Sequence, residues 1–301
     1  MNAKTELLRR LSFVILWAVF EILQARAQSP PSFTTQPTNQ TVTSGTSVTL
    51  VATVTGGGPY SYQWQLNGTN LPNTITTVAG TGVGAYSGDG RPATNASLYW
   101  PCALAFDPVG DLIISDYENN RIRRIDSNGV ISTIVGNGMI RGLANGVPIP
   151  NGDGGAATNA CVDGARGVAC DAMGNLYIAG GSIRMVGTNG IVTTLVPDTA
   201  EFFAGDGGPA TNASVYDPAS ITVDSFGNVF IADTGNLRVR RIDTNGVITT
   251  VAGNGFLAQA GEGGAATNAA ISEPCDVPVD GWGSLFILNG RDSDIFKVDT
   301  N

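Results

Sequence analysis

The sequence predicts an all-β protein built from repeated four-stranded units. The first observation is a motif, Gly-Asp-Gly-Gly-Pro-Ala-Thr-Asn-Ala or a close variant, that returns four times, beginning at Gly88, Gly152, Gly205 and Gly261. The second is an apolar run after each copy, which ends in an aspartate and a glycine turn; the aspartates are Asp107, Asp171, Asp224 and Asp280. Self-similarity at a spacing of about 55 residues indicates stacked units that bury their faces against their neighbours.

Each unit contains four short candidate strands separated by turn residues. In the first unit we expect strands at residues 103–106, 112–115, 121–125 and 130–135, and in the third unit at 221–223, 229–232, 239–242 and 247–251. In these two units, Asp-x-x-Gly turns separate the first strand from the second and the third from the fourth. Short strands with regular turn chemistry and no helical period predict four-stranded blades.

Two segments of the third unit carry a family resemblance. Residues 228–233 (Asn-Val-Phe-Ile-Ala-Asp) and 236–243 (Asn-Leu-Arg-Val-Arg-Arg-Ile-Asp) resemble the NHL-repeat family of β-propellers. The repeated loop motif is similar to the variety found in bacterial surface proteins and in teneurin NHL domains. The resemblance covers residues 75–301 and implies an NHL-type β-propeller, while it says little about function.

The number of blades raises the question of closure. Such propellers commonly close with about six blades, whereas four are recognisable here, and the last stops before its outer strand. Residues 75–80 read Ile-Thr-Thr-Val-Ala-Gly, an outer-strand sequence that would complete the last blade of a closed four-bladed ring. We favour the alternative, an incomplete propeller that forms an open arc.

The segment before the repeats resembles the front half of a bacterial immunoglobulin-like domain. The matching residues are Gln36-Pro37, the run from Gly45 to Leu50, and Tyr62 to Gly68 around Trp64. Asn67-Gly68 predicts a tight hairpin. The later strands of such a sandwich are missing, so we expect a truncated module. We divide the chain into residues 1–27, 28–73 (linker and immunoglobulin-like module) and 74–301 (propeller).

The first 27 residues are typical of a secretory signal peptide. A basic start with Lys4, Arg9 and Arg10 precedes an apolar run at 11–20, and Ala25-Arg26-Ala27 suits cleavage before Gln28. A membrane anchor is the competing interpretation, but Glu21 cuts the run short of a span. We expect a secreted, periplasmic or cell-surface protein with no membrane span after cleavage.

Composition excludes several classes of function. The net charge is −9 and the chain has no histidine, which disfavours nucleic acid as a partner and removes histidine-based catalysis and imidazole zinc sites. The four cysteines at 102, 161, 170 and 275 show no metal-ligand spacing. Small buried thiols are the favoured interpretation, with a Cys161–Cys170 disulfide as the alternative.

Strand direction assigns the loops to two faces of the propeller. The Asp-x-x-Gly turns share one face, and the long Gly-Asp-Gly-Gly loops share the other with the loops after each second strand. The long-loop face gathers acidic and amide side chains as candidate ligand-binding residues: Asp89, Asp116, Asn120, Asp153, Asp206, Asp233, Asn236 and Glu262. Carboxylates suit calcium, yet an aspartate in a glycine turn more often bonds its own backbone. Asp116 and Asp233 are expected to pair with Arg121 and Arg238, and the arginine clusters to be solvated.

These observations favour an exported, non-catalytic binding scaffold over an enzyme. We expect it to recognise a protein or a glycan through the long-loop face, without a cofactor other than possible calcium. The alternatives are a calcium-dependent, lactonase-like hydrolase and an architectural spacer. The hydrolase would need Glu and Asn or Asp side chains converging on the axis, and the glutamates after the signal segment occupy non-equivalent positions.

Overall fold

A computed structural model describes residues 75–140, 151–198, 203–257 and 261–299, together with six short strands elsewhere. The chain divides into two compact units, residues 1–76 and 77–301. The expected signal segment and Trp64 lie outside the described residues. No helix in the described part of the chain is long and apolar enough to cross a membrane.

The first unit contains two antiparallel strand pairs. Strand β1 (Ser32–Thr35) pairs with β2 (Thr53–Thr55). Strands β3 (Gln65–Leu66) and β4 (Thr69–Asn70) flank the Asn67-Gly68 pair and are in register across it, which confirms the expected hairpin.

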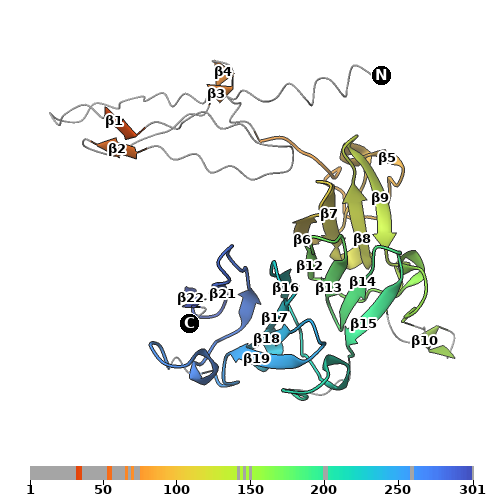
Figure 1. The fold of residues 1–301 in the computed structure, drawn as a ribbon. Helices are drawn as coiled ribbons and strands as arrows, with labels where there is room; N and C mark the ends of the chain where they lie inside the picture. Colours follow the sequence, from red (N-terminus) through yellow and green to blue (C-terminus); the bar gives the residue numbers. More distant parts are fainter. Residues whose placement is uncertain are drawn as a thin grey trace. The chain divides into compact units, whose positions relative to one another are not determined.

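The second unit is a row of antiparallel blades (Figure 1). Blade 1 consists of β6 (Pro101–Phe106), β7 (Leu112–Asp116), β8 (Arg121–Ile125) and β9 (Val130–Val135), with the short β5 (Arg91–Pro92) added outside β9. Blade 2 consists of β12 (Gly167–Cys170), β13 (Leu176–Ala179), β14 (Ile183–Val186) and β15 (Val192–Val196). The two-stranded hairpin of β10 (Leu143–Ala144) and β11 (Val147–Pro148) precedes blade 2.

Blade 3 repeats the pattern with β16 (Ser220–Val223), β17 (Val229–Asp233), β18 (Arg238–Ile242) and β19 (Ile248–Ala252). Blade 4 has three strands within the described residues, β20 (Pro274–Asp276), β21 (Leu285–Asn289) and β22 (Asp294–Val298). The strands expected for the first and third units are thus confirmed to within two residues. The all-β propeller architecture is confirmed as well.

The cores of the second unit lie between successive blades. Ile113 and Ile122 of blade 1 pack with Val168 and Ile178 of blade 2. Blade 2 packs on blade 3, and blade 3 on blade 4, through equivalent positions. Because most strands are covered on both faces, they read as nearly continuous apolar runs; β13 and β17 are buried along their whole length.

The repeated loop motif has a steric basis that involves its first glycine and its last alanine. A Cβ atom at Gly205 would lie 2.4 Å from Cα of Ala213, and one at Gly88 would lie 2.5 Å from Cα of Ala96. Between them, each Ala-Thr-Asn forms one turn of 3₁₀-helix; these turns are η1 (Ala93–Asn95), η3 (Ala157–Asn159), η4 (Ala210–Asn212) and η6 (Ala266–Asn268). Two further 3₁₀ turns, η2 (Tyr117–Asn119) and η5 (Thr234–Asn236), follow the second strands of blades 1 and 3.

The loop also holds the outer strand of its own blade. In blade 1 the amide of Gly90 donates to the carbonyl of Ile131, and in blade 3 the amide of Gly207 donates to that of Ile248. The motif therefore secures an outer strand that follows it by about 40 residues, which is why it recurs once per blade.

Candidate functional site

In blade 1, a buried arginine forms ion pairs with two acidic residues of the long-loop face. In blade 1, Arg123 is fully buried and binds Asp116 at 3.0 Å and Asp89 at 2.6 Å. Asn119 Nδ2 donates to Asp116 Oδ2 at 2.9 Å, and the guanidinium of Arg123 lies 4.9 Å from the ring centre of Tyr86. One guanidinium therefore links the loop motif, the end of β7 and an aromatic side chain.

Blade 3 contains the same cluster. The fully buried Arg240 binds Asp233 at 3.3 Å and Asp206 at 3.1 Å, Asn236 donates to Asp233, and Phe203 replaces the tyrosine. Burial raises the pKa of Asp233 above its ordinary value despite donors from the Tyr216 amide, Asn236 and Arg240.

The Asp89 carboxyl behaves in the opposite way, since it lies nearer the surface. Burial alone would raise its pKa, but hydrogen bonds from Thr133 and Arg123, together with the charge of Arg123, hold the pKa below its ordinary value.

Blades 2 and 4 vary the cluster. In blade 2, Arg184 binds Asp153 at 2.6 Å and also donates to the carbonyls of Cys161 and Asn151, while Gly180 takes the position of Asp116. In blade 4 the three positions hold Glu262, Phe296 and Asn289, so the arginine is absent and the aspartate at the end of the second strand has become an amide.

These contacts correct two sequence-based expectations. Asp116 and Asp233 pair with Arg123 and Arg240, not with Arg121 and Arg238, whose guanidinium groups donate to loop carbonyls instead. The arginine clusters are not wholly solvated, because Arg123 and Arg240 have no exposed surface. A buried charge needs a partner of opposite sign, so these carboxylates neutralise the buried guanidinium groups.

The candidate residues of the long-loop face therefore differ in availability. Asp116, Asp233 and Asn236 are buried. Asp89, Asp153 and Asp206 keep about a third of their side-chain surface exposed but are paired with arginine. Glu262 is exposed, and the side chain of Asn120 accepts from the amide of Gly164. Within the described residues, no three acidic or cysteine side chains are grouped so that they could hold a metal ion.

Asn119 is a member of the cluster that the sequence interpretation missed. The available signal was spacing, since Asp116 and Asn119 are separated by two residues, as are Asp233 and Asn236. Asn120, which was chosen instead, corresponds to Leu237, and both adopt left-handed backbone after the 3₁₀ turn.

The four inner strands β6, β12, β16 and β20 line a cavity of about 600 Å³. Three cysteines of the chain lie on it: Cys102, Cys170 and Cys275. All four cysteines fall within the described residues and none forms a disulfide, so the Cys161–Cys170 pairing is not present. Asp276 is the one carboxylate in the lining described for this cavity, which does not provide the converging acids that a lactonase-like site would need.

The cavity thiols are poor nucleophiles. Burial, with the charges of Asp107 and Asp171, raises the pKa of Cys170 to about 11. Burial also raises the pKa of Cys102 and, with Asp276, that of Cys275. Since the thiolate is the reactive form, these groups are not suited to catalysis at neutral pH.

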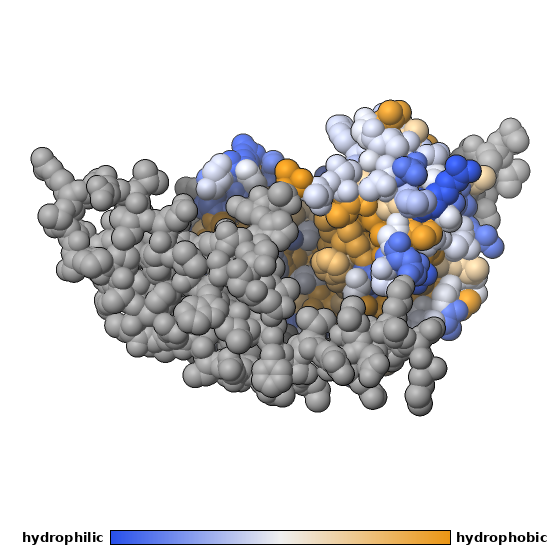
Figure 2. All heavy atoms as spheres, turned by 90° about the horizontal axis from the view of Figure 1, so that it is seen from above, coloured by the Kyte–Doolittle hydropathy of each residue, from blue (hydrophilic) through white to orange (hydrophobic). Residues whose placement is uncertain are grey.

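Exposed apolar side chains surround one end of the inner strands. The third residue of each inner Asp-x-x-Gly turn is large, apolar and between 77 and 85% exposed; the four are Val109, Met173, Phe226 and Trp282. We call these residues the inner-turn ring. Figure 2 shows apolar surface between hydrophilic residues on one face of the molecule.

Turn geometry does not require apolar residues at these positions. In each inner turn the residue's amide donates to the Asp side chain, as in Phe226 to Asp224 at 2.9 Å. The outer turns of blades 1 and 3 have the same bond, as in Asn245 to Asp243 at 2.9 Å, and the third residue of the outer turn is asparagine in blades 1 to 3 (Asn128, Asn189 and Asn245). One turn type thus carries asparagine at the outer positions and apolar residues at the inner ones.

The opposite end of the inner strands has a different character. Trp100, Asp217 and Glu273 precede the inner strands of blades 1, 3 and 4 in left-handed backbone, where blade 2 has Gly164. Left-handed backbone costs a non-glycine residue about 1–2 kcal/mol. Asp217 also binds Arg166 of the cavity lining at 2.6 Å. Next to these positions Tyr99 and Tyr216 are each 47% exposed, so this end combines charged and aromatic side chains.

The comparisons with known proteins agree with this architecture. The teneurin NHL domain matches residues 148–204 and 200–260, and the immunoglobulin domain matches residues 30–96. The chain therefore contains an NHL-type β-propeller preceded by an immunoglobulin-like segment.

Curated relatives are teneurins. Teneurin-1 of Mus musculus is 28% identical over 249 residues, which is 73% of this chain and 9% of teneurin-1. Teneurin-4 of Homo sapiens is 35% identical over 103 residues, 32% of this chain and 3% of the relative. The chain thus spans less than a tenth of the length of either protein.

The similarity to solved structures is weaker in sequence identity than the similarity to the teneurins. An auxiliary nutrient binding protein from Bacteroides ovatus has a TM-score of 0.48 and 14% identity, covering 68% of this chain and 49% of its own. A gluconolactonase from Xanthomonas campestris has a TM-score of 0.39 and 14% identity, covering 66% and 75%. At these values neither likeness bears on function.

Proposed function

We propose that this chain is a non-catalytic binding scaffold whose propeller takes a protein ligand on the inner-turn ring. The observation that carries the proposal is the contrast between the two sets of turns. Four apolar side chains are exposed to solvent at the inner turns. At the outer turns, asparagine occupies the same turn position with the same backbone geometry. Exposed apolar groups that the fold does not need are typical of interaction sites.

The ring has the chemistry of a protein-binding surface. Phe226 and Trp282 are large aromatic side chains of the kind that dominate the energetics of protein interfaces, and Met173 adapts to varied shapes. The net charge of −9 and the aspartate beside each ring residue favour a partner with an apolar centre and a basic rim. This choice moves the expected site away from the long-loop face, because most carboxylates there are paired with buried arginines.

A displayed library of random peptides is a suitable probe, with the full chain as bait. We expect enriched peptides to combine aromatic or aliphatic residues with Lys or Arg. Replacing Phe226 and Trp282 together by asparagine should weaken binding at least 30-fold, since loss of an aromatic anchor costs about 2 kcal/mol or more. The matched control is Asn128→Ala with Asn245→Ala at the outer turns, which should leave binding unchanged.

Three results would overturn the proposal. Peptides that bind the Phe226→Asn/Trp282→Asn variant as tightly as the parent would move the site elsewhere, and glycan binding insensitive to that variant would favour the long-loop face. Turnover of a lactone panel that disappears on chelation would show that the chain is a hydrolase, not a scaffold.

A further inference from the structure

The residue of the inner-turn ring that belongs to blade 2 is a methionine, Met173. It is 79% exposed, whereas Met139 is 52% exposed and Met185 is partly buried against the core between blades 2 and 3. Blade 2 packs against blade 1 on one side and blade 3 on the other, so the exposure of Met173 is a property of its turn. A thioether is thus exposed to solvent within the proposed binding surface.

The turn that carries Met173 is closed without the help of its side chain. The backbone amide of Met173 donates to Asp171 Oδ1 at 2.9 Å. The amide of Gly174 donates to the carbonyl of Asp171 at 3.1 Å, and Asn175 Nδ2 donates to Asp171 Oδ2 at 2.7 Å. A chemical change of the thioether therefore leaves the hydrogen bonds of the turn intact.

The cysteines compete poorly with this thioether for an oxidant. Peroxides attack the thiolate form of a cysteine, and burial raises the pKa of Cys102, Cys170 and Cys275, that of Cys170 to about 11. Cys161 is only 1% exposed. A thioether has no proton to lose before it reacts, so Met173 keeps its reactivity at neutral pH.

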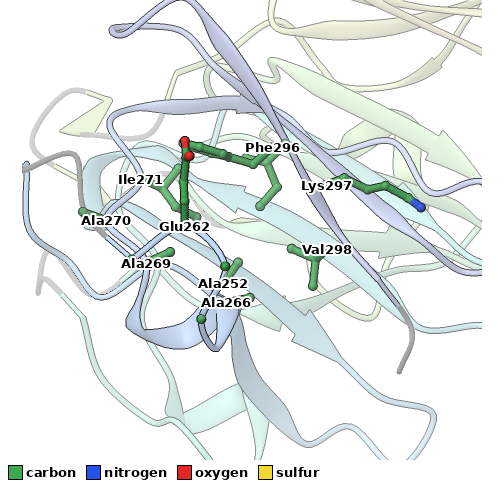
Figure 3. A pocket seen from close by; sticks show the side chains of 13 residues that line it. Ala252, Glu262, Ala266, Ala269, Ala270, Ile271, Phe296, Lys297 and Val298 are labelled. Carbon is green, nitrogen blue, oxygen red and sulfur yellow. The ribbon is translucent and has the colours of Figure 1, made fainter.

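The pocket of blade 4 offers an oxidant no alternative target. Figure 3 shows this cavity of about 560 Å³, whose lining includes Glu262, Phe296 and Lys297. No methionine or cysteine is among the described residues that line it. The thioether of Met173 is therefore the sulfur that is most open to an oxidant in the part of the chain that the structure describes.

We propose that Met173 is an oxidation site through which hydrogen peroxide weakens the binding of a partner to the inner-turn ring. This regulation rests on the proposed function, in which the ring contacts the apolar centre of a protein ligand. Met173 sulfoxide carries a polar S=O group that the interface would have to desolvate, whereas the thioether is apolar and adaptable. Oxidation therefore lowers affinity without changing the fold.

The reaction is a two-electron oxidation of the thioether sulfur. The O–O bond of hydrogen peroxide breaks, one oxygen atom forms the S=O bond of methionine sulfoxide, and the other leaves as water. Sulfur loses the two electrons that the peroxide gains. A thiol-dependent methionine sulfoxide reductase reverses the change, because two thiols supply two electrons and two protons, and the products are the thioether, water and a disulfide.

Peptide mapping of the full chain after treatment with hydrogen peroxide tests the site without any partner. Sulfoxide is expected to form first at Met173, and at least about tenfold more slowly at the partly buried Met185. The rate at Met173 should be the same at about pH 6 and pH 8, since a thioether does not titrate. Oxidation of Met185 or of the cavity thiols ahead of Met173 would refute the assignment.

The consequence for binding is tested with a peptide enriched on the full chain as bait. Peroxide treatment of the parent is expected to weaken binding at least about fivefold, and reduction by the sulfoxide reductase to restore it. In Met173→Leu, which lacks the oxidisable sulfur, affinity should be the same before and after treatment. In Met139→Leu, the matched control at the other exposed methionine, treatment should weaken binding as in the parent.

Two outcomes separate this inference from the proposed function. If a peptide is released by Phe226→Asn/Trp282→Asn but binds the oxidised and untreated parent equally well, the regulation is refuted and the binding surface stands. A peptide that is insensitive to the double variant refutes the binding surface, and with it the regulation, whatever the order of sulfoxide formation.

Discussion

Replacing Arg240 by methionine tests whether the acidic side chains of the long-loop face serve the fold. The variant leaves Asp233 with no exposed surface and without its cation, and it removes the donors to the carbonyls of Ser214 and Ala204. Breaking a buried ion pair by removing one partner costs about 3–5 kcal/mol. Adding Asp233→Asn should recover most of this loss, because the amide needs no counter-charge. Blade 4 carries such a neutral arrangement in Asn289 and Phe296.

The measurement is urea unfolding followed by circular dichroism. At a slope of about 1–3 kcal/mol per molar urea, Arg240→Met should lower the midpoint by more than about 1 M, and the double variant should lie much closer to the parent. Asp206→Asn is the control, since its carboxylate is 37% exposed and such pairs contribute less than about 1 kcal/mol.

The pH dependence of the same variant supplies a sign test. Burial raises the folded-state pKa of Asp233 above its unfolded value, so its contribution to stability is greatest in acid and is lost as the pH rises. The defect of Arg240→Met should therefore shrink as the pH is lowered from neutral towards the ordinary carboxyl pKa of about 4. An unchanged defect across this range, or a double variant as unstable as the single one, would refute the reasoning.

Two further predictions concern the turns and the thiols. Backbone hydrogen bonds from Val130 and Val247 lower the pKa of Asp126 and Asp243 in the folded state. Their contribution to stability is therefore present above the ordinary pKa of about 4 and is lost as the pH falls below it. The melting temperature of the double variant Asp126→Asn/Asp243→Asn should accordingly depend less on pH between about 5 and 3 than that of the parent. With a pKa raised to about 11, Cys170 should alkylate far more slowly than a free thiol at pH 8, and its rate, followed by mass spectrometry, should rise about tenfold per pH unit up to pH 10.

Much of the fold could be predicted because its signals are local and recur. Strand runs, Asp-x-x-Gly turns and the loop motif each return in several blades, so an error in one unit is corrected by the others. The 3₁₀ turns were missed because Ala-Thr-Asn is a single turn, too short to show a helical period.

The roles of the arginines could not be read from strand alternation. In β8, Ile122 and Arg123 are adjacent and both fully buried, because the strand is covered on both faces. Alternation of apolar and polar residues identifies the buried face of a strand only where the other face is exposed to solvent. Arg123, and not Arg121, binds the carboxylates because Asp89 approaches it from 34 residues away in sequence. The residue pattern of the third strand alone does not indicate that long-range contact.

Blade 4 shows that the charged positions of the loop cluster and the glycine–alanine contact of the loop motif can vary independently. There Glu262 stands at the aspartate position of the motif, Phe296 at the position of the buried arginine and Asn289 at that of the second aspartate, so two of the three charges are absent. The glycine and alanine did not change: Gly261 has positive φ, and a Cβ there would lie 2.7 Å from Cα of Ala269, as at the equivalent positions of the other blades. The close approach of glycine to alanine is thus sufficient to shape the loop. An aspartate occurs at the motif position only where a third strand supplies an arginine to bind it; blade 4, which lacks the arginine, has the exposed Glu262 there.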